Sequence, residues 1–242
     1  MKITPAPSPN FGPRRHGRGP DMVVLHHTAM LTAKAAVERL CDPVAEVSAH
    51  YVISRDGEII QLVAEDMRAW HAGAGRWGET DDLNSHSIGI ELDNSGPLTA
   101  LPPFPEPQMH ALELLLTDCM ARHSIPPENV IAHSDMAPVR KFDPGAKFDW
   151  HRLARQGLSV WPANLGEPEA VQDAAFLKAA EKFGYHLPEN CETPVATLVS
   201  AFRLRFFPGK SGVVDGQDVA AITDLAQRFP SRVGLDPEAG TS

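Results

Sequence analysis

Apolar residues recur along the first part of the chain at the spacings typical of strands. Residues 22–27 form a short apolar run, which predicts a buried strand whose carboxyl end carries two histidines. Residues 50–54 and 58–63 flank an Arg-Asp-Gly turn, and this arrangement predicts a hairpin. Residues 87–93 alternate between apolar side chains and polar or small ones, as a half-buried strand does. The pattern therefore predicts a sheet.

Helical spacing of apolar residues appears in two further segments, residues 32–40 and residues 107–124. Residues 130–133 read as another short strand, followed by a long loop to Trp150. Residues 1–20 are rich in Pro, Gly and Arg, which predicts an irregular arm. This mixture of strands and helices predicts an α/β domain.

The last third of the chain has a different pattern. Residues 158–168 contain two prolines and a glycine and are typical of a linker. Beyond them, three amphipathic stretches of helical spacing cover residues 169–183, 193–206 and 215–229. We therefore expect a first domain over residues 1–160 and a small C-terminal three-helix module over residues 168–232.

The composition argues against several classes of protein. The net charge of −9, from 31 acidic against 22 basic residues, argues against a nucleic-acid binder and against attachment to an anionic membrane. No run of about 18 apolar residues is present to span a bilayer, and no signal peptide is recognisable. Cys41, Cys119 and Cys191 form neither a disulfide framework nor a CxxC site, which fits a reducing compartment. We expect a cytoplasmic protein, or a periplasmic one if an export signal has been removed.

The candidate chemistry lies in three segments where polar residues follow apolar strands: residues 24–28, 90–92 and 132–145. A strand end followed by a loop fixes a side chain yet leaves it open to a ligand. Two histidines and an aspartate from such places would hold Zn²⁺ and leave a fourth position for water. A glutamate beside them would move protons, and a lysine would stabilise an oxyanion. Each residue alone has a commoner role in a core or a turn, so it is their joint occurrence that favours a site.

Six short motifs occur in a fixed order along residues 20–155. They are His26-His27-Thr28-Ala29, Ser48-Ala49-His50-Tyr51, Arg55-Asp56-Gly57, Ala69-Trp70-His71-Ala72-Gly73, Ser87-Ile88-Gly89-Ile90-Glu91 and His133-Ser-Asp-Met-Ala-Pro-Val-Arg-Lys-Phe-Asp-Pro-Gly145. In this order they resemble the zinc-dependent N-acetylmuramoyl-L-alanine amidases of the type 2 amidase family, which is related to the peptidoglycan recognition proteins. The resemblance implies an α/β fold with a central mixed β-sheet flanked by helices.

The resemblance also assigns roles residue by residue. The zinc-ligand positions fall on His26, His133 and Asp143, the proton-transferring glutamate on Glu91 and the catalytic lysine on Lys141. The positions expected to bind substrate are Trp70, His71, His27 and Arg140.

Two positions, His27 and His50, leave alternatives open, whereas Ala49 excludes one. His27 is the rival of His26 as a ligand, because successive strand residues point to opposite faces and only one of the two faces the metal easily. Ala49 stands where enzymes like phage T7 lysozyme have a tyrosine, so proton transfer depends on Glu91. His50 supports the site from behind or contacts the substrate, or else it is a packed strand residue.

The resemblance implies a zinc hydrolase that cleaves the amide between N-acetylmuramic acid, or its 1,6-anhydro form, and L-alanine of the stem peptide during peptidoglycan turnover and recycling. Zn²⁺ is the cofactor implied, and peptidoglycan fragments (muropeptides) are the partners, with no nucleic acid and no membrane. The alternatives are a non-catalytic muropeptide sensor, a Cys/His hydrolase and a secreted autolysin. The sequence determines neither the oligomeric state nor the preference between intact peptidoglycan and soluble muropeptides.

The C-terminal module contains a helix, residues 201–208, that resembles the helical peptidoglycan-binding domain found in one branch of this family. The positive and negative charges of the module nearly cancel, so electrostatic attraction alone would not hold it on a polyanionic cell wall. The apolar stripes with Phe202, Phe206 and Phe207 are expected to pack against one another. We expect the module mainly to support the first domain, with glycan binding as the alternative.

Overall fold

The computed structural model describes residues 1–17, 19–167, 169–187 and 191–234. Six strands form one sheet in the order β1-β5-β4-β7-β3-β8, and two more, β2 and β6, pair separately. The bounds are β1 Ile3–Pro5, β2 Phe11–Pro13, β3 Met22–His27, β4 Tyr51–Ile53, β5 Ile59–Gln61, β6 Met67–Ala69, β7 Ser87–Leu92 and β8 Val130–Ala132. The pairs of β7 with β4, β7 with β3 and β3 with β8 are parallel, whereas β4 and β5 are antiparallel. The sheet is therefore mixed.

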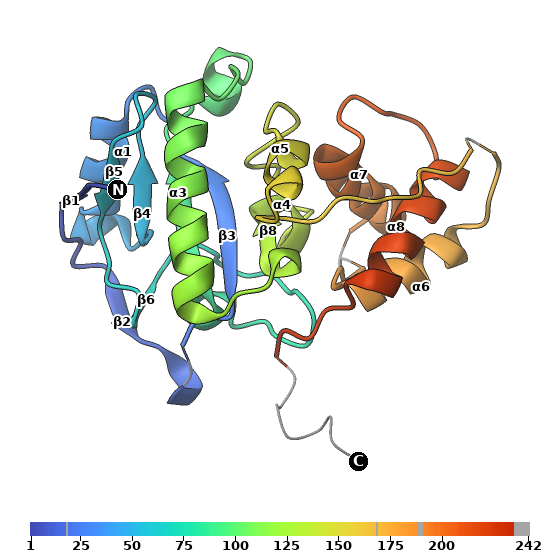
Figure 1. Ribbon diagram of the computed structural model, residues 1–242, viewed down its shortest axis with the longest axis horizontal. Helices are drawn as coiled ribbons and strands as arrows, with labels where there is room; N and C mark the ends of the chain where they lie inside the picture. Colours follow the sequence, from blue (N-terminus) through green and yellow to red (C-terminus); the bar gives the residue numbers. More distant parts are fainter. Residues whose placement is uncertain (18, 168, 188–190, 235–242) are drawn as a thin grey trace.

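The helices surround this sheet (Figure 1). Their bounds are α1 Ala33–Leu40, α2 Leu83–His86, α3 Glu106–His123, α4 His133–Met136, α5 Trp150–Arg155, α6 Asp173–Phe183, α7 Pro194–Phe206 and α8 Gly216–Arg228, with 3-10 turns η1 Arg15–Gly17, η2 Pro43–Ala45, η3 Gly96–Thr99 and η4 Pro127–Asn129. The expected central mixed sheet flanked by helices is confirmed. The hairpin is confirmed as well, with Tyr51 opposite Gln61 and Gly57 in the positive-φ region that its turn requires.

Three local expectations were wrong. The arm expected to be irregular supplies β1, which pairs with β5, and β2, which pairs with β6. Strands of three residues carry too little periodicity to be recognised, and their partner strands complete their hydrogen bonds. The strand β7 is also not half-buried, because Ser87 and Gly89 on its polar face are covered as fully as its apolar residues. His133, expected to close a strand, instead begins the helix α4.

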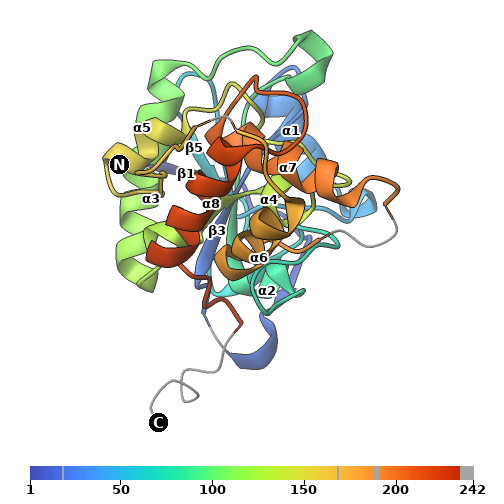
Figure 2. The same cartoon turned by 90° about the vertical axis from the view of Figure 1, so that its right-hand side faces the viewer.

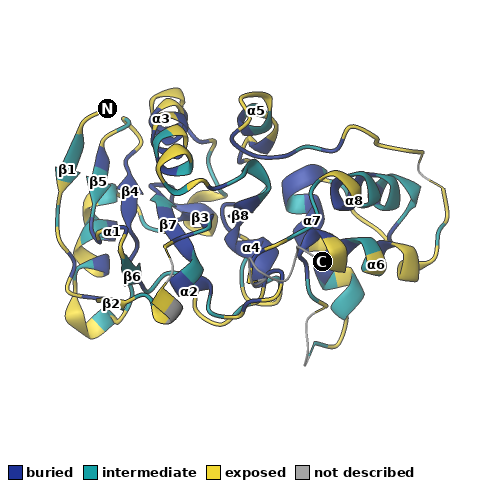
Figure 3. Cartoon of the chain, turned by 60° about the horizontal axis from the view of Figure 1, so that its bottom comes forward, coloured by how far each residue is buried: buried dark blue, intermediate teal, exposed yellow. Residues whose placement is uncertain are grey.

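Side chains along each strand alternate between the two faces of the sheet, so the hydrophobic core has one part on each face. One face of the sheet packs against α3, whose Leu112, Leu115 and Leu116 are fully buried there. Val23 and Leu25 of β3 point to this face. Figure 3 shows the resulting buried interior beneath the more exposed outer surfaces of the helices.

The helices α6, α7 and α8, here called the helical module, lie beyond β8 and α4 (Figures 1 and 2). Met22 and Val24 of β3 share one hydrophobic cluster with Phe176, Phe202 and other apolar residues of the module. The ends of the three helices lie within four residues of the expected bounds. Independence of the module as a separate domain stays a prediction, since its core is continuous with that of the sheet.

Among the described residues, no helix combines the length and the hydropathy that crossing a bilayer demands. The expected compartment stays a prediction.

Candidate metal centre

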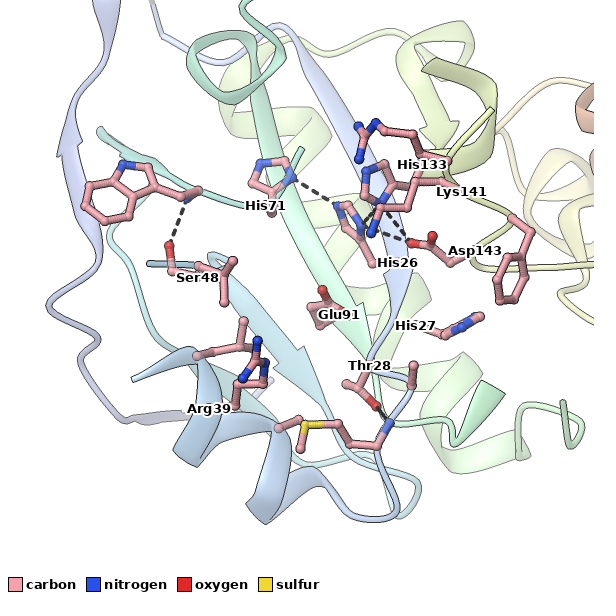
Figure 4. A pocket seen from close by; sticks show the side chains of 18 residues that line it. His26, His27, Thr28, Arg39, Ser48, His71, Glu91, His133, Lys141 and Asp143 are labelled. Atoms are coloured by element: carbon pink, nitrogen blue, oxygen red, sulfur yellow. Dashed lines mark hydrogen bonds and ion pairs between the residues drawn. The ribbon is translucent and has the colours of Figure 1, made fainter. Parts of the chain in front are cut away.

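The site begins with two neighbouring parallel strands. His26 of β3 stands in register with Glu91 of β7, so the two side chains lie next to each other on the same face of the sheet. His133 comes from the first turn of α4, directly after β8, which is the other neighbour of β3. Lys141 and Asp143 lie on the loop that follows α4. Figure 4 shows these five side chains converging on one cavity.

Three of these side chains bring their ligand atoms together. Nδ1 of His26 lies 2.8 Å from Nδ1 of His133 and 3.2 Å from Oδ2 of Asp143, and His133 Nδ1 lies 3.0 Å from the same oxygen. A tetrahedral zinc ion with bonds of about 2.0–2.1 Å holds its ligand atoms roughly 3.3 Å apart. A slight expansion of the trio therefore accommodates such an ion.

The tautomer of His133 follows from its second nitrogen. Nε2 of His133 donates to the carbonyl oxygen of Ala72 at 3.0 Å. Because a neutral imidazole carries one proton, Nδ1 of His133 is left with a free lone pair directed at the other two ligand atoms.

A chain of hydrogen bonds determines the tautomer of His26 in the same way. The Ser87 hydroxyl donates to the carbonyl oxygen of Leu83 at 2.5 Å, so its oxygen accepts from Nε2 of His71 at 3.1 Å. His71 Nδ1 then has no proton and accepts from Nε2 of His26 at 3.0 Å. Nδ1 of His26 is therefore the free nitrogen. This series of hydrogen bonds requires a glycine at position 89, because a Cβ there would lie 2.3 Å from the His71 ring.

Two lone pairs and a carboxylate oxygen thus face one another with no proton between them. Burial lowers the pKa of His26 to about 4, with His133 adding to the effect and Asp143 opposing it, so His26 is neutral near pH 7. Three acceptor atoms arranged in this way could hold a metal ion. Among the described residues, this is the group of histidine and acidic side chains able to hold one.

Glu91 adds a carboxyl group whose ionisation is unusually costly. Burial raises its pKa to about 8; the charge of Asp143 adds to this rise and that of Lys141 opposes it. Oε2 of Glu91 is buried and has no hydrogen-bond partner among the described residues. A carboxyl group with such a pKa exchanges protons readily near neutral pH, as a general acid–base group must.

The cavity around these groups has a volume of about 350 Å³. The four positions expected to bind substrate all line it, namely Trp70, His71, His27 and Arg140. His27 points to the other face of β3 from His26, with its Nδ1 donating to the Pro144 carbonyl oxygen at 3.2 Å. Arg140 donates to the carbonyl oxygens of Ala72 and Ala74 and so ties the two loops of the rim together.

The comparison with known proteins decides the family. The family model for N-acetylmuramoyl-L-alanine amidase (Amidase_2) matches residues 16–146. The chain belongs to this family. It is 34% identical over 231 residues to N-acetylmuramoyl-L-alanine amidase AmiD of Escherichia coli K12, covering 86% of this chain and 83% of the relative. It is 36% identical to 1,6-anhydro-N-acetylmuramyl-L-alanine amidase AmpD of the same organism, over 61% of this chain and 87% of the relative.

Solved structures of such amidases superpose closely. The complex of E. coli AmiD with anhydro-N-acetylmuramic acid-L-Ala-D-γ-Glu-L-Lys has a TM-score of 0.80 at 32% identity, covering 93% of both chains. AmpDH3 of Pseudomonas aeruginosa, in complex with anhydromuramic pentapeptide, has a TM-score of 0.79 at 31% identity, covering 90% of this chain and 95% of that one. These superpositions cover nearly the whole chain, so the structural similarity includes the helical module.

Other residues of this amidase have structural roles. Of the alternatives for His50, the geometry favours the packed strand residue: its Nδ1 accepts from the Gly89 N–H at 2.9 Å, and its Nε2 donates to the Met67 carbonyl oxygen at 3.1 Å. The cavity lining contains no cysteine among the described residues, and the Cys119 thiol is buried with a raised pKa, chiefly because of that burial. A Cys/His site therefore finds no support.

Sequence reasoning missed the residues behind the metal ligands. Ser87 orients His71, and the Asn84 side chain accepts from the backbone N–H groups of His71 and Ala72 at 3.0 and 2.9 Å. A serine at the start of a strand and an asparagine in a short helix carry no local signal of such a role. The one available indication was Gly89, since a glycine inside a strand marks a close approach by another group.

Proposed function

We propose that this amidase uses Zn²⁺ to hydrolyse the amide between the lactyl group of N-acetylmuramic acid, in its 1,6-anhydro form among others, and L-alanine of the stem peptide. The observation that carries the proposal is the convergence of three acceptor atoms in one cavity with Glu91, whose Oε2 is buried and has no hydrogen-bond partner among the described residues. The relatives support the substrate class, because AmiD of E. coli forms a complex with an anhydromuramoyl tripeptide as substrate.

The ligand set favours zinc among the common metals. His26, His133 and Asp143 offer two imidazole nitrogens and one carboxylate oxygen, which leaves a fourth tetrahedral position open. When bound, Zn²⁺ supplies a Lewis acid that polarises the scissile carbonyl and makes water acidic enough to attack near neutral pH.

Two residues of the chain perform the proton and charge chemistry. Glu91 accepts the proton of the attacking water and passes it to the leaving amine of L-alanine. The Lys141 ammonium group, which lines the same cavity, stabilises the negative charge that develops on the carbonyl oxygen. Trp70, His27 and Arg140 line the remaining walls and are positioned to hold the sugar and the peptide.

A defined substrate tests the reaction. The metal-loaded protein is incubated with anhydro-N-acetylmuramyl-L-Ala-D-γ-Glu-L-Lys, and separately with intact sacculi, and the products are identified by mass spectrometry. Release of the free tripeptide and anhydro-N-acetylmuramic acid is expected. Binding of the muropeptide without cleavage would instead identify a sensor, and cleavage of any other bond would refute the proposed specificity.

Replacing Lys141 tests the stabilisation of charge. We expect Lys141→Met to lower kcat/KM by about 10²-fold with zinc still bound, because one donor to a developing oxyanion is commonly worth that much. Lys147→Met is the matched control, since Lys147 is exposed and does not line the cavity. Equal activity of both variants would remove Lys141 from the mechanism.

Replacing His71 tests the hydrogen-bond chain behind His26. His71→Phe keeps a ring but removes both nitrogens, so the tautomer of His26 is no longer held and zinc affinity is expected to fall about 10- to 100-fold. His50→Phe is the control, because His50 is a buried histidine whose ring nitrogens bond to backbone groups, the N–H of Gly89 and the carbonyl oxygen of Met67. Zinc affinity is measured by competition with a chelator. If the two variants bind zinc equally well, the chain of hydrogen bonds does not orient the ligand.

A further inference from the structure

A buried arginine of the helical module reaches the turn that carries His133. Arg205 of α7 is 1% exposed, and α7 lies beside α4 and β8 in Figure 1. Its Nη2 donates to the Val130 carbonyl oxygen of β8 at 3.0 Å, and its Nη1 donates to Oδ2 of Asp135 in α4 at 2.8 Å. The guanidinium thus contacts both sides of the strand-to-helix turn that contains His133.

Asp135 receives further hydrogen bonds at the same turn. Its Oδ1 accepts from the Tyr185 hydroxyl at 2.5 Å, and its Oδ2 accepts from the backbone N–H of Ala132 at 2.8 Å. Tyr185 follows α6, so two residues of the C-terminal region hold one carboxylate. Both lie outside residues 16–146, the part of the chain that the family model matches.

This contact is connected to two of the three proposed metal ligands. His133 lies between Ala132 and Asp135 in the chain, so the turn sets the position of the backbone from which its ring extends. The next backbone N–H, that of Ser134, donates to the carbonyl oxygen of Asp143 at 3.1 Å. A shift of the turn would therefore displace His133 and Asp143 together.

Stability alone is a weak explanation for such a pair. Burying two opposite charges costs desolvation energy that apolar residues of similar volume avoid. The module contains a second buried pair, Arg203 with Asp218, which connects only α7 and α8. The Arg205 pair instead connects the module to a segment of the metal centre.

We propose that Arg205 and Tyr185 are positioning residues of the metal centre, which hold His133 and Asp143 in their ligating geometry through Asp135. The inference rests on the proposed metal-dependent function. It makes the helical module a part of the site's architecture, whether or not the module also binds glycan.

The test compares two buried arginines of one helix. Arg205→Met and Arg203→Met each remove the cation of a buried pair, but only the first touches the His133 turn. Zinc affinity of the metal-free full chain is measured by chelator competition, and the visible spectrum of the Co²⁺-substituted protein reports ligand geometry. We expect Arg205→Met to weaken zinc binding about 10-fold or more and to alter the Co²⁺ spectrum. Arg203→Met is expected to leave both near wild type.

Two conservative variants keep the test decisive if Arg205→Met folds poorly. Tyr185→Phe removes one hydroxyl from Asp135 and is expected to weaken zinc binding by a smaller factor, and Arg205→Lys is expected to be intermediate. Wild-type zinc affinity and Co²⁺ spectrum in Tyr185→Phe and Arg205→Lys, or equal losses in Arg205→Met and Arg203→Met, would overturn the positioning role. Those results would leave the amidase proposal intact. A wild-type chain that binds no zinc would overturn both.

Discussion

Glu91→Gln is expected to lower kcat/KM by 10²-fold or more while the metal remains bound. The substitution keeps the shape of the side chain but removes the group that accepts a proton, and general acid–base catalysis is commonly worth about 10²–10⁴-fold. Glu91 stands beside the ligand trio without belonging to it, so metal content should not change. Metal analysis and steady-state kinetics on the same preparation check both parts. Near wild-type turnover would assign the proton transfer to another group.

The same substitution should stabilise the metal-free protein at high pH. The pKa of Glu91 is raised from an ordinary 4.5 to about 8, chiefly by burial, so the folded state disfavours the ionised carboxylate. The resulting destabilisation is absent below about pH 4.5, grows between pH 4.5 and 8, and is complete above pH 8. A shift of this size corresponds to an upper limit on the order of 5 kcal/mol.

Denaturant unfolding of the metal-free wild type and Glu91→Gln at pH 4.5 and pH 9 measures this difference. We expect Glu91→Gln to be the more stable protein at pH 9 and the two to be similar at pH 4.5. Glu113→Gln is the control, and its effect on stability at high pH should have the opposite sign. Hydrogen bonds from Arg152 lower the pKa of Glu113, so the folded state favours its ionised carboxylate. A stability difference that does not change with pH would show that the Glu91 carboxylate is hydrated in solution.

His26→Ala is expected to abolish metal binding and turnover together, whereas His27→Ala keeps the metal. Three protein ligands leave no redundancy, so the loss of one removes most of the affinity. The two histidines are neighbours in β3 but point to opposite faces, and only His26 lies within 3.2 Å of the ligand atoms of both His133 and Asp143.

Metal content per chain, measured after dialysis against zinc buffer, distinguishes the two histidines. Asp143→Ala should behave like His26→Ala. One zinc per chain in His26→Ala, together with its loss in His27→Ala, would reverse the assignment of the pair.

The sequence by itself determined the elements that have a strong period. The apolar run of β3, the Asp-Gly turn between β4 and β5, the long helix α3 and the three helices of the module were all predicted within a few residues. Their side-chain spacing is set by neighbours along the chain, so local pattern suffices. The ordered motifs also identified the family and named His26, His133 and Asp143 as candidates before any fold was known.

The tertiary structure decided which side chains meet. Alternation separates His26 from His27, but only the pairing of β3 with β7 and β8 determines which of them faces Glu91 and His133. The role of His71 depends on Ser87, 16 residues away, and the clamp of Arg205 on Asp135 joins residues 70 apart. Such contacts leave no period in the sequence, because they form only when the packed sheet and helices bring distant segments together.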